Sequence, residues 1–255
     1  MQYGICHLSV VPVMETAGTT SPMISQLLYG EHFKVLEKRK QWSKIRNAFD
    51  QSEGWTANNQ FLIISETEYK KIDSSKTPKY SLDLISFVSQ DSVTLIPIVL
   101  GSSLPDTSKL PHDFDGVRTT HNNPKDLLVH TALMYLNAPY QLGGRTPFGL
   151  DGSGFTQMVY KLCGHTLSRQ PQEQSLQGDA LSFIEESDPG DLAFFDNAEG
   201  EIFHVGIILK NNFIIHVNGK VRVDRLDHTG IFNTDLGRYT HNLRVIKKVI
   251  ASSNG

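Results

Sequence analysis

The sequence predicts an α+β fold in which one or two small β-barrels precede a larger mixed domain. Residues 4–64 hold short apolar clusters of strand length between turns, a pattern typical of a small barrel. From residue 124 the apolar residues first follow helical spacing and then form long strand-like runs. A chain of 255 residues with 39% hydrophobic residues can form one large domain or two to three small ones.

Composition argues against several classes of protein. The net charge of −3 gives no electrostatic case for binding nucleic acid or an anionic membrane. Cys6 and Cys163 are too few for a disulfide framework. No apolar run approaches the roughly 20 residues that span a bilayer, and the first residues show no signal-peptide pattern. We therefore expect a soluble, cytoplasmic protein without nucleic-acid or membrane partners; the sequence leaves its oligomeric state open.

The β-rich part of the chain divides into two expected modules. The first covers residues 1–65, and a polar linker or short helix should follow over 66–80. A second small β module is expected over 80–123. Its clearest strand, 93–100, contains Pro97, which cannot donate a ladder hydrogen bond and therefore predicts an edge strand or a bulge.

Two helices are expected early in the last region, residues 124–250. Apolar residues at helical spacing predict the first helix over 126–136. A loop that contains glycine and proline separates it from the second, expected over 153–163 with one apolar face. Gly164 should end that second helix, because glycine readily adopts the left-handed conformation that follows a helix.

Further along, two strands predict a hairpin with one histidine on each arm. If residues 210–212 form a three-residue loop, Gly206 faces His216, and His204 and His216 lie on the same face of the sheet. A two-residue loop would place the two histidines on opposite faces. We expect the longer loop, with an asparagine in the left-handed conformation.

Six short motifs follow one another in the last region. They are Tyr140 with Gly143-Gly144, Asp151-x-Ser153-Gly154-Phe155, Arg169 with Gln174, Pro189-Gly190-Asp191 with Phe194-Phe195, His204-Val205-Gly206, and Ile215-His216. In this order they resemble the catalytic domain of the NlpC/P60 cell-wall peptidases, a papain-like α+β fold. The β modules ahead resemble bacterial SH3 domains, which often end in a step such as Gly54-Trp55. The resemblance implies a scaffold that cuts murein peptides between γ-D-glutamate and a diamino acid.

The resemblance also implies a site whose central residue is changed. The family's nucleophilic cysteine begins a helix, where the helix dipole favours thiolate; this chain has Gly152 at that position. His204 would be the base, and His216 would orient its imidazole. The histidines show no HExxH or similar spacing, so neither a metal nor a cofactor is expected. The residues implied in substrate binding are Tyr140, Asp151, Ser153 and Arg169.

No other residue is expected to replace the sulfur. Cys163 lies roughly 16 Å further along the helix and should be a buried core thiol. Ser153 is turned about 100° around the helix axis, its hydroxyl is far less acidic than a thiol, and the histidine pair is expected to lack a carboxylate.

Three other positions also depart from the family pattern. Leu142 replaces a tryptophan. The tyrosine and the glutamate that recognise a free N-terminal alanine in the family fall at Ser52 and at either Thr16 or Pro22.

Three hypotheses follow from these residues. In the first, the protein is inactive because of Gly152 and binds murein-derived peptides. In the second, the chain comes from an active peptidase in which position 152 was altered. In the third, it is an interaction protein that works through its SH3-like modules.

Overall fold

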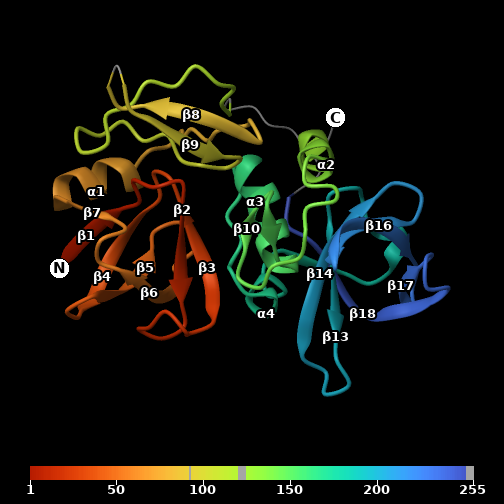
Figure 1. The fold of residues 1–255 in the computed structure, drawn as a ribbon. Helices are drawn as coiled ribbons and strands as arrows, with labels where there is room; N and C mark the ends of the chain where they lie inside the picture. The colour runs from red at the N-terminus through yellow and green to blue at the C-terminus, as the bar shows by residue number, and fades with distance from the viewer. Residues whose placement is uncertain (92, 120–124, 251–255) are drawn as a thin grey trace. The chain divides into compact units, whose positions relative to one another are not determined.

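The chain forms two compact units, shown in Figure 1. The computed structural model describes residues 1–91, 93–119 and 125–250. Unit 1 comprises residues 1–122 together with 142–147, and unit 2 comprises residues 123–141 and 148–255. The predicted α+β class is confirmed, because both units are built on β-sheets and helices accompany them. Every helix among the described residues is too short or too polar to cross a bilayer.

Unit 1 is built on a seven-stranded antiparallel sheet. Along β5 the buried and half-buried residues alternate, as expected for a strand with one face on the core. Burying each large apolar side chain of this core stabilises the fold by about 1.5–3 kcal/mol. The main core residues are Cys6, Val11, Val13, Leu27, Phe33, Val35, Ile45 and Phe61. In sheet order the strands are β3 (Met23–Leu28), β2 (Val10–Met14), β6 (Glu53–Ala57), β5 (Trp42–Asn47), β4 (His32–Lys38), β1 (Gln2–Ile5) and β7 (Leu62–Ile64).

The expected linker contains a helix, α1 (Glu66–Asp73). Ser65 begins it with a capping box, in which its hydroxyl accepts from the backbone N–H of Glu68 and the Glu68 carboxylate accepts from that of Ser65. Tyr69 is the buried residue of this helix and packs against Tyr3 of the barrel. The short-helix alternative for this segment is therefore correct.

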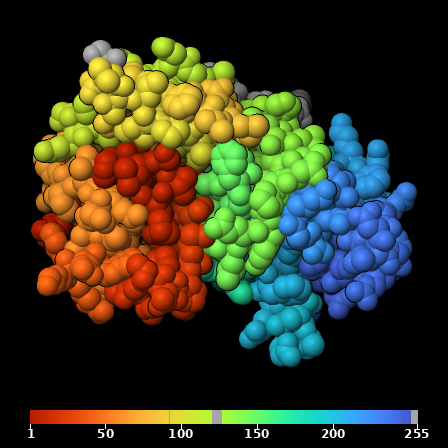
Figure 2. All heavy atoms as spheres, viewed as in Figure 1, coloured from red at the N-terminus to blue at the C-terminus, as the bar shows by residue number. Residues whose placement is uncertain are grey.

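The second β module contains one antiparallel hairpin, β8 (Ile85–Ser89) with β9 (Leu95–Val99). Pro97 lies in β9 of this two-stranded sheet, which agrees with the predicted edge position. Val88 and Ile98 share a buried cluster with barrel residues such as Tyr29. Figure 2 shows the yellow segment that contains β8 and β9 lying on the red and orange residues of the same unit. Whether the module is a separate SH3-like domain stays a prediction.

Unit 2 is built on a second seven-stranded sheet. Its strands run, in sheet order, β12 (Asp179–Leu181), β18 (Arg238–Lys248), β13 (Leu192–Asp196), β14 (Ile202–Leu209), β15 (Phe213–Asn218), β16 (Lys220–Leu226) and β17 (Gly230–Asn233). A further pairing joins β17 to β18, so the strands from β18 to β17 form a closed ring. Unit 2 also contains the helices α2 (Lys125–Leu133), α3 (Gly152–Leu162), α4 (Pro171–Gln174) and η1 (Ile184–Glu186) and the two-residue strand β11 (Gly149–Leu150). The two-residue strand β10 (Arg145–Thr146) belongs to unit 1.

The two predicted helices of this region form, with different ends. The first, α2, ends at Leu133 rather than 136. The backbone N–H groups that follow donate to carbonyls three residues earlier, which forms tight turns instead of a further α-helical turn. The segment then reaches Asn137, which has a φ of 69°. The second, α3, begins one residue earlier than expected, at Gly152, and packs against β14 and β15. Gly164 follows its C-terminus at φ 83°, which confirms the expected stop.

Candidate active site

The β14–β15 hairpin has the predicted register. Gly206 pairs with His216, and residues 210–212 form a three-residue loop. Both asparagines of this loop adopt a φ of 60°, which confirms the left-handed turn and shows that it uses two residues rather than one. His204 lies two positions before Gly206 and therefore shares a face of the sheet with His216.

The two histidines belong to a buried relay that ends on a carboxylate. His204 Nε2 lies 2.9 Å from His216 Nδ1, and His216 Nε2 lies 3.0 Å from Asp224 Oδ2. Since the carboxylate can only accept, His216 carries its proton on Nε2 and accepts at Nδ1 from the Nε2–H of His204. This hydrogen-bond pattern leaves His204 Nδ1 with its lone pair, ready to accept a proton.

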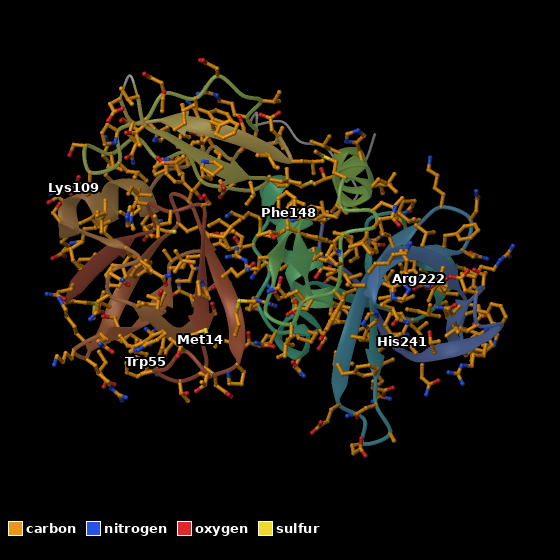
Figure 3. All side chains as sticks on the ribbon, viewed as in Figure 1. Met14, Trp55, Lys109, Phe148, Arg222 and His241 are labelled. Carbon is orange, nitrogen blue, oxygen red and sulfur yellow. The ribbon has the colours of Figure 1, made fainter. Side chains whose placement is uncertain are left out.

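The expectation that the histidine pair lacks a carboxylate is wrong. Asp224 lies on β16, which pairs with β15 and places Arg222 opposite His216. Arg222 holds the Asp224 carboxylate with two hydrogen bonds, of 2.7 and 2.9 Å. Figure 3 shows Arg222 near His241, on the same unit. The signal was the alternation of charged residues along 220–224, which puts Arg222 and Asp224 on the histidine face.

The surroundings keep the relay in its neutral-histidine form. Burial lowers the pKa of His204 well below its usual value, and the neighbouring histidines lower it further. Burial also lowers the pKa of His216, although its bond to Asp224 acts the other way. Burial alone would raise the pKa of Asp224, but hydrogen bonds from His216 and Arg222 outweigh it, and the net pKa is lowered. Asp224 is therefore ionised at neutral pH and both imidazoles are neutral.

Gly152 lies at the start of α3, facing the free nitrogen of this relay. A Cβ added to Gly152 would lie 3.6 Å from His204 Nδ1 and 3.5 Å from the Val205 carbonyl oxygen, ordinary contact distances. A side chain therefore fits here without displacing its neighbours. A cysteine at this position would hold its sulfur beside the base and at a helix N-terminus, where thiolate is favoured.

Asp151, Ser153 and Arg169 form one network at the same helix end. Arg169 donates to Asp151 Oδ2 over 2.7 Å and to the Ser153 hydroxyl over 2.9 Å. Asp151 also caps α3 by accepting from the backbone N–H of Gly154 over 2.7 Å. The buried Ser153 hydroxyl thus bonds to Arg169 and is not paired with His204. Arg169 is buried rather than a solvated surface charge. Substrate binding by these residues stays a prediction.

Tyr140 lies on a segment that runs beside the start of the site. Its backbone forms a parallel bridge with Leu150, which directly precedes Asp151. The Tyr140 side chain is 50% exposed, so it is available to a ligand.

Cys163 is buried at the opposite end of α3, and burial raises its pKa to about 11. The expectation of a buried core thiol is confirmed.

A third histidine, His241, was missed by sequence reasoning. Its ring stacks on that of His204, with centroids 4.1 Å apart and an angle of 28° between the planes. The Phe203 ring also stacks on the His241 ring, with the two centroids 5.7 Å apart. His241 lies on β18, 37 positions after His204 in the chain. The two rings meet because β13 lies between β14 and β18 in the sheet.

Two family models match the chain in the regions just described. Residues 137–238 match the NlpC/P60 family, and residues 13–61 match the bacterial dipeptidyl-peptidase SH3 domain. The chain carries an NlpC/P60 domain preceded by a bacterial SH3 domain. The resemblance read from the six motifs is therefore confirmed, and the relay lies within the NlpC/P60 domain.

Curated relatives and a solved structure agree with this assignment. The γ-D-glutamyl-L-lysine dipeptidyl-peptidase of Bacillus cereus is 28% identical in an alignment 228 positions long, which covers 75% of this chain and 66% of that relative. Dipeptidyl-peptidase 6 of Lysinibacillus sphaericus is 26% identical in an alignment 239 positions long, which covers 80% of this chain and 84% of that relative. A crystal structure of an NlpC/P60 family protein from Bacillus cereus shares the fold with a TM-score of 0.79 at 18% identity, covering 98% of this chain and all of that one. These relatives support a function connected with peptidoglycan.

Proposed function

We propose that this protein binds murein-derived peptides on an NlpC/P60 cysteine peptidase scaffold and does not cleave them. One observation carries the proposal: a Cβ at residue 152 would lie 3.6 Å from His204 Nδ1, but glycine provides no atom that could attack. The relay of His204, His216 and Asp224 is otherwise assembled. Ser153 does not substitute for the sulfur, because its hydroxyl is held by Arg169.

The same geometry explains what a cysteine at position 152 would do. His204 Nδ1 would accept the thiol proton, and the sulfur would attack the carbonyl carbon of the γ-D-glutamyl bond. The imidazolium would return the proton to the leaving amine, and water would then release the acyl group. His216 and Asp224 would hold the His204 ring and stabilise its positive charge. With Gly152 the first step is impossible, while the groups that surround a bound peptide remain.

The relatives suggest the class of ligand. One relative is named for γ-D-glutamyl-L-lysine, and the names of both describe dipeptidyl-peptidases. We extend this to peptides that contain L-Ala-γ-D-Glu followed by a diamino acid, either L-lysine or diaminopimelate. Tyr140, Asp151, Ser153 and Arg169 are the proposed contacts. The cytoplasmic location expected from the sequence stays a prediction.

A second candidate function keeps the same ligand and adds catalysis. The intact relay and the space at residue 152 favour a peptidase whose nucleophile was altered at this one position. Reading codon 152 in the natural gene distinguishes this candidate from the first. The third hypothesis, an interaction protein that uses its SH3-like modules, requires no peptide site in unit 2.

Calorimetry with defined peptides tests the proposal. We expect L-Ala-γ-D-Glu-L-Lys or its diaminopimelate counterpart to bind at one site, with no product detectable by chromatography after long incubation. The α-linked peptide L-Ala-L-Glu-L-Lys is the matched control and should bind more weakly. Absence of heat with all of these peptides would refute the proposal and favour the interaction protein. Cleavage by the unchanged protein would refute the statement that it is inactive.

A further inference from the structure

Three imidazoles converge in unit 2, and the peptidase relay uses two of them. His204, His216 and His241 come from β14, β15 and β18, and one ring nitrogen of each lies within 4.8 Å of the others. We propose that these three histidines form a binding site for one transition-metal ion of the zinc type. This site goes beyond the proposed peptide binding and does not depend on it.

Each ring has a nitrogen available to a metal ion. His216 Nε2 bonds to Asp224, which leaves His216 Nδ1 as the ligand. His241 Nδ1 lies 2.9 Å from the Thr240 hydroxyl, which leaves its Nε2. His204 turns its Nε2 towards His216 Nδ1. Neutral imidazoles are good ligands for zinc, cobalt and nickel, and none of the three ligands is a carboxylate, which would favour a harder ion.

Asp224 adds a feature common to metal-binding histidines. Such histidines donate their second ring N–H to a carboxylate, which fixes the tautomer and makes the ligand nitrogen more basic. Asp224 accepts this bond from His216 and is itself buried. The neighbouring Arg222 does not leave an excess positive charge, because both Asp224 and Asp235 pair with it.

Metal binding requires two local movements. Zinc–nitrogen bonds of about 2.0–2.1 Å place tetrahedral ligands about 3.4 Å apart, so the 2.9 Å contact between His204 and His216 must widen. Stacked rings cannot both aim in-plane lone pairs at one ion, so His241 must turn out of its 28° stack on His204. His241 is only half-buried, which allows this rotation.

The metal and the relay exclude each other. To bind the ion, His204 moves its proton from Nε2 to Nδ1, with no net proton gained or lost. His204 Nδ1 then carries hydrogen and can no longer accept a proton from a group at position 152. A bound ion therefore switches off the base even in a chain with a restored nucleophile.

Metal titration of the untagged full chain, freed of metal with a chelator, tests this proposal. We expect one Co²⁺ per chain with the visible absorption bands of a four-coordinate site, and one Zn²⁺ by calorimetry. His241→Phe keeps an aromatic ring in the stack but removes a ligand, and should weaken binding at least 10-fold. Asp224→Asn should weaken it 10- to 100-fold, about the usual effect of losing such a carboxylate. His228→Ala, at an exposed position, is the control and should not change it.

Two results would overturn the proposal: no binding at one ion per chain, or equal affinity in the His241→Phe variant. Circular dichroism establishes that each variant is folded, and His241→Gln replaces His241→Phe if the latter is not. Peptide calorimetry on the metal-free chain is independent of these readings. Failure to bind metal therefore leaves the peptide proposal standing, and failure to bind peptide leaves the metal proposal standing.

Discussion

Each unit contains a buried arginine–carboxylate pair, and the two pairs differ in what surrounds them. In unit 1, Arg145 and Glu31 are 0% and 2% exposed and form two parallel hydrogen bonds. In unit 2, Arg169 is 2% exposed but Asp151 is 13% exposed. Glu31 is fully enclosed, whereas Asp151 also caps a helix and is partly exposed. The first pair is structural, and the second belongs to the proposed peptide site.

The enclosed pair should have the largest effect on stability. Arg145→Met leaves Glu31 buried without its charge partner and should lower the free energy of unfolding of unit 1 by about 3–5 kcal/mol. Both tryptophans, Trp42 and Trp55, lie in this unit, so tryptophan fluorescence in a urea titration reports on it alone. Arg46→Met, at a partly exposed ion pair, is the control and should cost at most about 1 kcal/mol. Equal losses of unfolding free energy in Arg145→Met and Arg46→Met would contradict the distinction between an enclosed and an exposed ion pair.

Breaking the partly exposed pair, Arg169 with Asp151, should destabilise its unit less than breaking the enclosed pair destabilises unit 1. Arg169→Met should destabilise unit 2 by about 2–3 kcal/mol, because Asp151 keeps its bond from the Gly154 N–H and some contact with water. Hydrogen exchange of the α3 amides measures this loss. Arg238→Met, at an exposed position, should leave exchange unchanged. A loss as large as that of Arg145→Met would mean that Asp151 is as tightly enclosed as Glu31.

Much of the site was predictable from the sequence because its signals are local. The start of α3 and the three-residue hairpin loop each depend on a few adjacent residues, and these place Gly152, His204 and His216 correctly. Asp224 and His241 were not predicted, because their contacts depend on how later strands pair. The same holds for Arg145, whose partner Glu31 lies 114 positions away. An ion pair at such separation has no periodic pattern in the sequence.

Acidification should affect unit 2 more than unit 1. Burial lowers the pKa of His241 to about 4 and also lowers those of His204 and His216. Unfolded histidines bind protons below about pH 6.5, so the unfolded state takes up protons first, and unit 2 loses stability as the pH falls from 6.5 towards 4. The lowered pKa of Asp224 adds a loss below about pH 4, where the unfolded carboxyl binds a proton that the folded one does not.

Urea titrations between pH 7 and pH 4 check this difference. In unit 1 burial lowers the pKa of the half-buried His7 in the same direction, so some loss is expected there too. Tryptophan fluorescence follows unit 1, and exchange of the α3 amides follows unit 2. We expect the steeper fall for unit 2, and a shallower one in the His241→Phe variant. Parallel curves for the two units would contradict the assigned role of the buried histidines.

The smallest effect is expected at Gly152, again in contrast with a residue of unit 1. Gly152→Ala should stabilise unit 2 by about 0.5 kcal/mol, because alanine favours the helix and its Cβ meets only ordinary contacts. Gly143→Ala should instead destabilise unit 1, since Gly143 has a φ of 75° and its Cβ would clash with the Met23 carbonyl oxygen. Thermal unfolding followed by circular dichroism measures both. Destabilisation by Gly152→Ala would show that position 152 does not accept a side chain.

The most direct measurement restores the missing atom. We expect Gly152→Cys to cleave L-Ala-γ-D-Glu-diaminopimelate, with the activity abolished by adding His204→Ala. The unchanged chain and Gly152→Ala should release no product under the same conditions. A folded, metal-free Gly152→Cys protein that binds the peptide but leaves it intact would contradict the central claim, that only a nucleophile separates this site from a working one.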